Sequence, residues 1–266
     1  MDRDRALLVA VEAARAAGEI LLAGLGAPKH AGQKAHRHDP VTLYDRRAEE
    51  TIVSSILEAF PDHGILGEEG TCRESSSGYR WVIDPLDGTN NYLRGFPQFG
   101  VSIALERAGL GELACVHDPL RRELFTAMRG EGAWLNGCRV HVSGQRAIDG
   151  ALIGVGYSSR PERALRVHDA FRRLIPHIRG GRCAGAASLD LAYVASGRLD
   201  GCWYVSLSRW DVAAGTLLVT EAGGRVSDLE GAALEDPESG IVASNGSIHD
   251  GMTATLRPNG DGSTDA

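Results

Sequence analysis

The fold and the chemistry of this chain are best read from the stretch Trp81-Val82-Ile83-Asp84-Pro85-Leu86-Asp87-Gly88-Thr89-Asn90. It opens with three residues of high β propensity, which predicts a strand that ends at Asp84. Pro85 has no backbone N–H and should stop further pairing, so the chain is expected to turn there. Such a turn can bring Asp84 and Asp87 toward a common point, with the carbonyl of Leu86 between them.

Gly88 and Thr89 follow the two aspartates, where a helix or a tight turn could begin. Backbone N–H groups at such a turn point toward an anion. Hard oxygen ligands beside a phosphate-sized anion pocket are what Mg²⁺ prefers, and the stretch offers no thiolate or imidazole for zinc. The alternative is that the aspartates merely cap a helix, which is the commoner use of aspartate when the motif is taken alone.

Two further acidic motifs shift the balance toward a metal site. Adjacent glutamates lie in Gly67-Glu68-Glu69-Gly70, directly after the apolar pair Ile65-Leu66 at the end of an expected strand. An aspartate starts an expected buried helix in Trp210-Asp211-Val212-Ala213-Ala214-Gly215. Either motif by itself is better explained as a solvated loop or a helix cap. Together, the three motifs favour a metal site.

Apolar periodicity predicts two helices early in the chain, over residues 3–25 and 42–60, with Pro61 ending the second. The serine-rich segment 72–78 is expected to be a loop. Short apolar runs bounded by glycine and proline then predict an antiparallel sheet. These runs are Trp81–Ile83, Gly100–Leu105, Glu112–His117 and Glu123–Met128.

The pattern changes near residues 143–150, beyond which strand-like and helix-like segments alternate as in a second α/β layer. The segments are Leu152–Val155, Pro161–Leu174, Ser188–Ser196, Gly201–Val205, Asp211–Ala222, Gly224–Ser227 and Ile241–Ala243. We therefore predict an α/β (α+β) protein with an N-terminal subdomain at 1–147 and a C-terminal subdomain at 148–257. The polar residues 258–266 are expected to form a disordered tail.

Composition excludes several classes of protein. Hydrophobic residues make up 43% of the 266 positions and charged residues 24%, which is ordinary globular usage and unlike disordered, fibrous or membrane chains. A net charge of −7 without a long basic run argues against a nucleic-acid partner. The five cysteines form no CxxC pair, and no signal peptide or membrane span is recognisable. We expect a cytoplasmic protein with reduced thiols.

The three acidic motifs, in this order and spacing, resemble the inositol monophosphatase family of Mg²⁺-dependent phosphatases. They read GEE at 67–69, WVIDPLDGTNNY at 81–92 and WDVAAG at 210–215. The likeness extends from the DPVTLYD stretch at 39–45 to the EAGG stretch at 221–224. It implies a layered αβαβα sandwich of the inositol monophosphatase and fructose-1,6-bisphosphatase type. It also implies a homodimer that hydrolyses a small-metabolite phosphate monoester to alcohol and inorganic phosphate with a metal-activated water.

The resemblance implies that two to three Mg²⁺ ions bind, and it implies a set of ligands for them. Glu68, Asp84 and the carbonyl of Leu86 would hold the first ion. Asp84, Asp87 and Asp211 would hold the second, and Glu68 would help to hold a weaker third. Two or more divalent ions would neutralise the phosphate dianion, lower the pKa of a bound water and stabilise the leaving alkoxide.

The resemblance also assigns roles around the ions. Asp45 and Thr89 match the pair that orients and deprotonates the attacking water, with Glu68 as a further catalytic carboxylate. The backbone N–H groups of Gly88 and Thr89 would bind the phosphate. Lys34 falls where the family often carries a lysine near the site, although a solvated lysine would look the same.

The substrate is less well defined by the sequence. Inositol-hydrolysing members carry a glutamate seven positions before the WD aspartate, and Tyr204 stands there in this chain. A phenol replaces a carboxylate that accepts bonds from ring hydroxyls, which favours a nucleoside, histidinol or modified cyclitol phosphate over plain inositol phosphate. Tyr204 could instead simply pack. Gly185 and Ala186 match the loop that lines the leaving-group pocket, and their small size would admit a bulky alcohol.

Rival functions fit less well. A phosphatase that forms an aspartyl-phosphate needs aspartates two apart and a later lysine, whereas here the spacing is three and no lysine follows Lys34. A serine hydrolase would need a G-x-S-x-G motif, which is absent from the sequence. His36 and His38 have no companion ligand at suitable spacing for a soft metal. An added regulatory binding role remains an alternative, because some family relatives touch the transcription machinery.

Overall fold

The structure, a computed structural model, describes residues 2–27, 32–33, 40–157 and 161–257. The predictions for Lys34, for His36 and His38, and for a disordered tail at 258–266 lie outside these residues. Within them, no helix combines the length and the apolar character that a membrane crossing requires.

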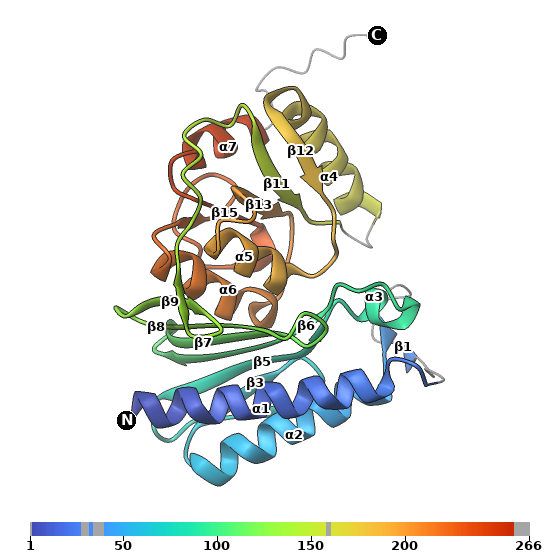
Figure 1. Cartoon of the computed structure of the whole chain (residues 1–266), viewed down its shortest axis with the longest axis vertical. Coiled ribbons are helices and arrows are strands. Elements are labelled where there is room, and N and C mark those ends of the chain that lie inside the picture. The colour runs from blue at the N-terminus through green and yellow to red at the C-terminus, as the bar shows by residue number, and fades with distance from the viewer. Residues whose placement is uncertain (1, 28–31, 34–39, 158–160, 258–266) are drawn as a thin grey trace.

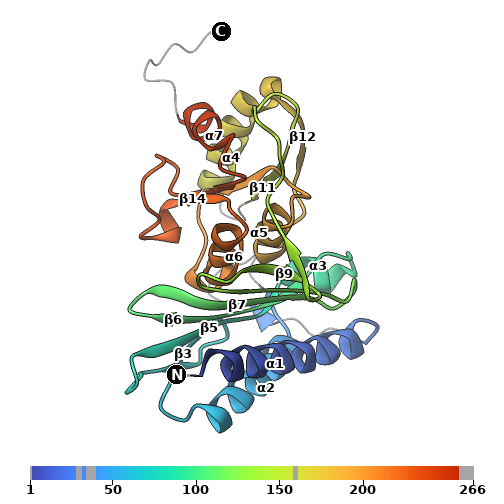
Figure 2. The ribbon, with the colours of Figure 1, turned by 60° about the vertical axis from the view of Figure 1, so that its left-hand side comes forward.

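Helices and sheets alternate in layers (Figures 1 and 2). The helices α1 (Arg3–Gly24) and α2 (Leu43–Ala59) cover the outer face of an eight-stranded sheet. The next layer consists of α5 (Ala187–Ala195) and α6 (Arg209–Glu221), which separate this sheet from a five-stranded one. The far face of the second sheet is covered by α4 (Pro161–Leu174) and α7 (His249–Leu256). This arrangement confirms the predicted αβαβα sandwich.

The eight-stranded sheet has the order β10-β9-β8-β7-β6-β5-β3-β4 and is antiparallel except between β3 and β5. Its strands are β3 (Gly64–Gly67), β4 (Cys72–Arg73), β5 (Tyr79–Asp87), β6 (Gly100–Arg107), β7 (Leu110–Asp118), β8 (Glu123–Met128), β9 (Gly132–Leu135) and β10 (Cys138–Val140). The short helix α3 (Thr89–Arg94) follows β5 directly.

The five-stranded sheet has the order β12-β11-β13-β15-β14 and mixes parallel with antiparallel pairs. Its strands are β11 (Ala151–Val155), β12 (Ile178–Arg182), β13 (Gly201–Tyr204), β14 (Arg225–Ser227) and β15 (Ile241–Ser244). A two-stranded ribbon, β1 (Gly32–Gln33) with β2 (Pro40–Val41), completes the described strands.

The predicted helices and most predicted strands are confirmed to within a few residues. The strands that the sequence did not predict are β1, β2, β4, β9, β10 and β12, which have two to five residues each. The residues of β4, β10 and β12 are at least partly exposed and largely polar or glycine-rich, so neither apolar alternation nor β propensity marks these strands. Strand β4 therefore occupies the first two residues of the segment 72–78, which was expected to be a loop throughout. Strand β9, with the sequence GAWL, is half buried but only four residues long.

One prediction about the central strand was wrong: β5 does not end at Asp84 but continues through Asp87. Asp84 pairs with Ser102 and Asp87 pairs with Gly100. The chain therefore advances three residues along β5 but only two along β6, so that β5 carries one extra residue between these pairs. Pro85 has no N–H for the ladder, and the irregularity places it where no pairing is needed. Proline therefore bends the strand locally instead of terminating it.

Strand β5 is buried on both faces, which explains its continuous apolar run. Trp81 and Ile83 pack into the core beneath α1 and α2, whereas Val82 packs into the core with α5 and α6. A third core joins α4 and α7 to the five-stranded sheet. Because both faces are covered, the end of β5 is held firmly at the level where α5 and α6 begin.

Candidate active site

The end of β5 opens onto a pocket of about 180 Å³ that draws residues from both halves of the chain. Its lining consists of Glu68, Asp84, Leu86, Asp87, Gly88, Thr89, Asn90, Gly185 and Asp211. The turn after β3, the end of β5, the start of α3, the segment before α5 and the first turn of α6 all contribute. Three acidic motifs that are far apart in the sequence are therefore gathered at one place.

The irregularity in β5 fixes the two aspartates of the central motif. Asp84 is 1% exposed, and its Oδ1 accepts a hydrogen bond from the N–H of Leu86 at 3.0 Å. Asp87 Oδ2 accepts two bonds from Ser188 at the start of α5, from its N–H at 2.7 Å and from its Oγ at 2.5 Å. These bonds fix the orientation of both carboxylates at the pocket.

Asp211 lies in the first turn of α6 and forms a capping box with Ser208. The N–H of Ser208 donates to Asp211 Oδ2 at 2.6 Å. The sequence left open whether this aspartate caps a helix or belongs to a site. The structure shows that it does cap the helix and that it lines the pocket as well.

Glu68 reaches the pocket from a turn that the buried residue Glu49 holds in place. Glu49 is 3% exposed on α2, and its carboxylate accepts bonds from Glu69 N at 2.8 Å, Thr71 N at 3.1 Å and Thr71 Oγ1 at 2.6 Å. None of the three acidic motifs includes this residue. A signal was present, because Glu49 falls on the helical stripe that also buries Ala48 and Ile52.

Asp45 and Thr89 are in contact, as expected for a pair that acts together. Thr89 Oγ1 lies 3.3 Å from Asp45 Oδ1 and 3.1 Å from the carbonyl oxygen of Leu86, so its single proton can be given to either acceptor. Asp45 is fully buried, and its Oδ2 accepts bonds from both the N–H and the hydroxyl of Thr42 at the start of α2. This capping box leaves Oδ1 directed at Thr89.

The electrostatics of the pocket are dominated by the burial of its carboxylates and by their closeness to one another. Burial raises the pKa of Asp84 well above its usual range, and the charges of Glu68, Asp87 and Asp211 raise it further. Burial raises the pKa of Asp87 to about 6, although its bonds from Ser188 oppose the change. Burial also raises the pKa of Asp45 against the effect of Thr42. A bound cation would reverse these shifts.

The donor set fits a hard divalent cation such as Mg²⁺. The described lining offers carboxylates and one backbone carbonyl and no sulfur or imidazole. Within the described residues, no three acidic, histidine or cysteine side chains close tightly on one point. Four carboxylates nevertheless share one pocket, and the pKa values of Asp84 and Asp87 are raised. A divalent ion would offset the repulsion between these carboxylates. The individual ligand assignments therefore remain predictions.

The residues predicted to contact the substrate lie at different depths. Gly185 lines the pocket, whereas Ala186 is fully buried. Tyr204 is 5% exposed, and its hydroxyl donates to Asp190 Oδ2 at 2.7 Å. A Cβ on Gly156 would meet the Tyr204 ring at 1.9 Å, so the ring is closely packed. Packing therefore describes Tyr204 in this structure, and its contact with a substrate stays a prediction.

Asn91 is a further residue that the sequence did not single out. Its Nδ2 donates to the carbonyl oxygens of Gln98 at 2.7 Å and Ala184 at 2.8 Å. The first bond lies within the N-terminal half, and the second ties α3 to the segment that carries Gly185. An asparagine in a polar run gives no sequence signal for such a link, because the partners are backbone groups.

Comparisons with known proteins agree with this fold. The inositol monophosphatase family matches residues 2–260. The Nus factor SuhB of Pseudomonas aeruginosa is 46% identical over 259 residues, covering 95% of this chain and 96% of that protein. The extragenic suppressor protein suhB of Bartonella henselae superposes with a TM-score of 0.92 at 38% identity, covering 96% of this chain and 99% of that chain. The inositol monophosphatase of Anabaena (Nostoc) gives a TM-score of 0.86 at 36% identity, with 96% of each chain covered. The chain therefore belongs to the inositol monophosphatase family.

Proposed function

We propose that this protein hydrolyses the phosphate monoester of a small metabolite to an alcohol and inorganic phosphate, with two to three Mg²⁺ ions as cofactors. The observation that carries the proposal is the meeting of Glu68, Asp84, Asp87 and Asp211 in one pocket beside Thr89. The likeness to a solved inositol monophosphatase supports the same reaction class.

Bound Mg²⁺ would supply charge neutralisation of the phosphate and a lowered pKa for the attacking water. The chain would do the rest by positioning. Asp45, hydrogen-bonded to the Thr89 hydroxyl, can take up a proton that Thr89 relays from a water at the pocket. The N–H groups of Gly88 and Thr89 would face the phosphate oxygens. Ser188 would keep one oxygen of Asp87 turned away from the pocket centre.

We propose further that the substrate differs from plain inositol phosphate. Among the described residues, β13 contributes no carboxylate to the pocket lining. The residue at the position in question is Tyr204, and its hydroxyl donates to Asp190. Vicinal ring hydroxyls would therefore lack the acceptor that the resemblance assigns to this position. Nucleoside, histidinol and modified cyclitol phosphates are the candidate classes.

The test is a phosphate-release assay over these monoesters and inositol 1-phosphate, each with Mg²⁺ and with EDTA. We expect release with Mg²⁺ only, and loss of release in Asp211→Asn. Undiminished release in EDTA would overturn the metal-dependent mechanism. A clear preference for inositol 1-phosphate would overturn the substrate proposal and leave the reaction class standing.

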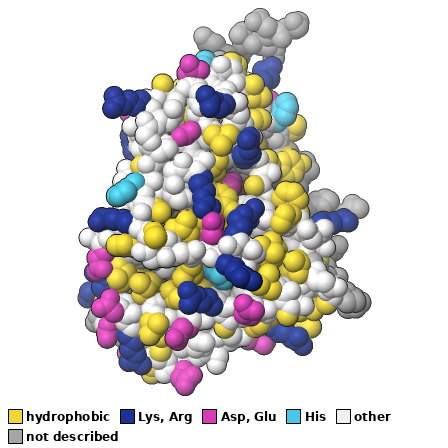
Figure 3. Space-filling model, viewed as in Figure 1, with side chains coloured by type: hydrophobic (Ala, Val, Ile, Leu, Met, Phe, Trp, Pro, Cys, Tyr) yellow, Lys and Arg dark blue, Asp and Glu magenta, His cyan; other side chains and the backbone are white. Residues whose placement is uncertain are grey.

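A second candidate role comes from the relatives named Nus factor SuhB, since that name describes a factor and not an enzyme. We propose that this chain retains such a binding role beside hydrolysis. The prediction against a nucleic-acid partner rested on net charge, and the face in Figure 3 shows basic side chains interspersed with acidic ones. If the Asp211→Asn variant keeps this binding role while losing phosphatase activity, the binding role is independent of turnover. The cytoplasmic location and the homodimer remain predictions.

A further inference from the structure

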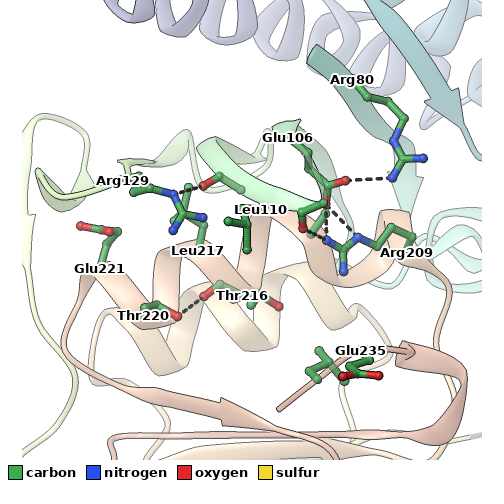
Figure 4. Close-up of a pocket in the computed structure, with 14 residues that line it drawn as sticks. Arg80, Glu106, Leu110, Arg129, Arg209, Thr216, Leu217, Thr220, Glu221 and Glu235 are labelled. Atoms are coloured by element: carbon green, nitrogen blue, oxygen red, sulfur yellow. Dashed lines mark hydrogen bonds and ion pairs between the residues drawn. The ribbon is translucent and has the colours of Figure 1, made fainter. Parts of the chain in front are cut away.

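A larger pocket, of about 560 Å³, lies away from the carboxylates (Figure 4). It is formed by the turn between β6 and β7, the length of α6, and the loop after β14. Its lining therefore joins the eight-stranded sheet to the C-terminal half. Its volume is typical of a site for a small organic molecule, and junctions of this kind are where such sites commonly occur. None of the proposed catalytic residues lines it.

Two of the acidic side chains that line this pocket already have their hydrogen-bond partners. Glu106 is 2% exposed, and its two oxygens accept from Arg80 at 3.0 Å and from Arg209 Nε at 2.8 Å. Both oxygens of Glu221 accept backbone N–H groups, from Gly130 at 2.8 Å and Gly132 at 2.9 Å. The pocket consequently has few acceptors left for a ligand that brings donors.

The donors of the pocket are in excess. A guanidinium carries five N–H groups, yet among the described residues those of Arg80 and Arg129 donate one hydrogen bond each. Their side chains are 46% and 44% exposed, so the remaining N–H groups can be reached. Thr216 adds a hydroxyl that is buried and has no partner within the described part of the chain. A ligand that accepts hydrogen bonds would fit this surplus.

The rest of the lining sets the ligand's other properties. Leu110, Ala213, Leu217 and Leu234 give the pocket an apolar wall that a purely polar ion would leave uncovered. Glu235 places an exposed carboxylate at the pocket, so that three glutamates balance the three arginines of the lining and a highly charged anion is disfavoured. The lining thus selects against inorganic phosphate and polyphosphates.

We propose that this pocket is a second binding site, separate from the catalytic one, for an organic anion of low charge with an apolar body, such as an aromatic carboxylate or sulfonate. The site is connected to the catalytic pocket through α6. Arg209 in the first turn of that helix reaches the second site, and Asp211 in the same turn lines the first. The proposal does not depend on the proposed reaction.

The probe for this site is 8-anilinonaphthalene-1-sulfonate, an aromatic sulfonate whose fluorescence rises in apolar surroundings. It is titrated into the full chain in EDTA, and again with Mg²⁺ and saturating inorganic phosphate. We expect saturable binding with the same Kd in both, because phosphate would occupy only the catalytic pocket. Unsaturable binding, or displacement of the dye by Mg²⁺ and phosphate, would overturn the proposal.

Three variants locate the dye. Arg129→Gln removes an exposed guanidinium and should weaken binding about tenfold, the usual weight of a charge-assisted bond. Leu110→Glu places a negative charge on a residue that is 59% exposed and should weaken binding at least as much. The control is Arg47→Gln, at an exposed position of α2, and it should leave the Kd of the dye within about twofold of the parent value. Equal Kd values in all three would place the dye elsewhere and refute the site.

A crystal soaked with the dye gives an independent readout that needs no variant. We expect its sulfonate near Arg80 or Arg129 and its rings against Leu217. Dye bound at any other surface with this pocket empty would refute the site even if the titration saturates.

Discussion

Ser188 shows how one side chain outside the motifs can control a site. It gives Asp87 two hydrogen bonds to the same oxygen, which fixes the rotation of the carboxylate. Groups that orient a metal ligand affect metal affinity almost as strongly as the ligands do. The residue before it, Ala187, adds a backbone hydrogen bond to the same carboxylate, so Ser188 supplies the side-chain donor at this position.

We predict that Ser188→Ala weakens activation by Mg²⁺ about tenfold or more while the protein stays folded, because Asp87 loses its hydroxyl donor but keeps the N–H. The measurement is the phosphatase rate as a function of Mg²⁺ concentration. Ser196→Ala is the matched control, since Ser196 Oγ bonds only within the end of α5. An unchanged Mg²⁺ dependence in Ser188→Ala would contradict the positioning role.

The Asp190–Tyr204 pair makes stability depend on pH. Burial raises the pKa of Asp190 to about 7, with the bond from Tyr204 opposing and the charge of Asp87 adding to the change. The native state keeps this proton after the unfolded chain has released it. The stabilisation is therefore complete below about pH 4 and is lost as the pH rises through about 7.

We predict that Asp190→Asn is more stable than the parent at pH 8, by up to a few kcal/mol, and about equal to it near pH 4. The asparagine oxygen can still accept the Tyr204 hydroxyl, so packing is kept. Urea denaturation at the two pH values measures the difference. A difference that does not change with pH would show that Asp190 titrates normally.

At the scale of elements, α2 positions the turn that carries Glu68. A Cβ on Gly67 would meet the Glu49 carboxylate at 2.5 Å, so helix and turn are in close contact. Three donors from the turn converge on this one carboxylate. The turn therefore has little freedom as long as Glu49 is charged.

We predict that Glu49→Gln raises the Mg²⁺ concentration needed for half-maximal activity by about tenfold, because one acceptor oxygen becomes an NH₂ facing N–H donors. Glu50→Gln, on the exposed side of the same helix, should have no comparable effect. The comparison is made by Mg²⁺ titration of activity. Equal behaviour of the two variants would mean that the turn is held by other contacts.

At the scale of the whole molecule, the pocket lined by the carboxylates draws residues from both halves of the chain. Glu68, Asp84 and Asp87 come from the end of the eight-stranded sheet, and Asp211 comes from α6. An ion bound by all of them would hold the halves together. Binding to the folded state alone stabilises that state by mass action.

We predict that Mg²⁺ at about a hundred times its Kd stabilises the protein by about 2.7 kcal/mol, a rise in Tm of roughly 5–10 °C for a chain of this size. Thermal melts with Mg²⁺ and with EDTA measure it. Asp211→Asn should lose most of the rise. A melting curve that millimolar Mg²⁺ leaves unchanged would count against the whole ligand set.

Much of this architecture could be predicted from local patterns. The long helices, the core strands and the three acidic motifs depend on spacing and composition over a few residues, and the structure places them as expected. Pro85 was misjudged because its effect depends on which partner strand lies beside it, and Ser102 and Gly100 on β6 accommodate the irregularity. Short strands such as β10 and β12 form only because neighbours pair with them.

By itself, the sequence determined the long helices, the core strands and the three acidic motifs, because periodicity and motif spacing are local properties of the chain. The resemblance of those motifs to the inositol monophosphatase family then implied the layered fold. Only the tertiary structure decided that Glu49, Ser188 and Asn91 hold the site and that Tyr204 turns toward Asp190. It also placed Arg80, Arg129 and Arg209 around a second pocket. These relations join residues tens of positions apart, and a contact of that kind exists only once packing has brought the two groups within reach of a hydrogen bond.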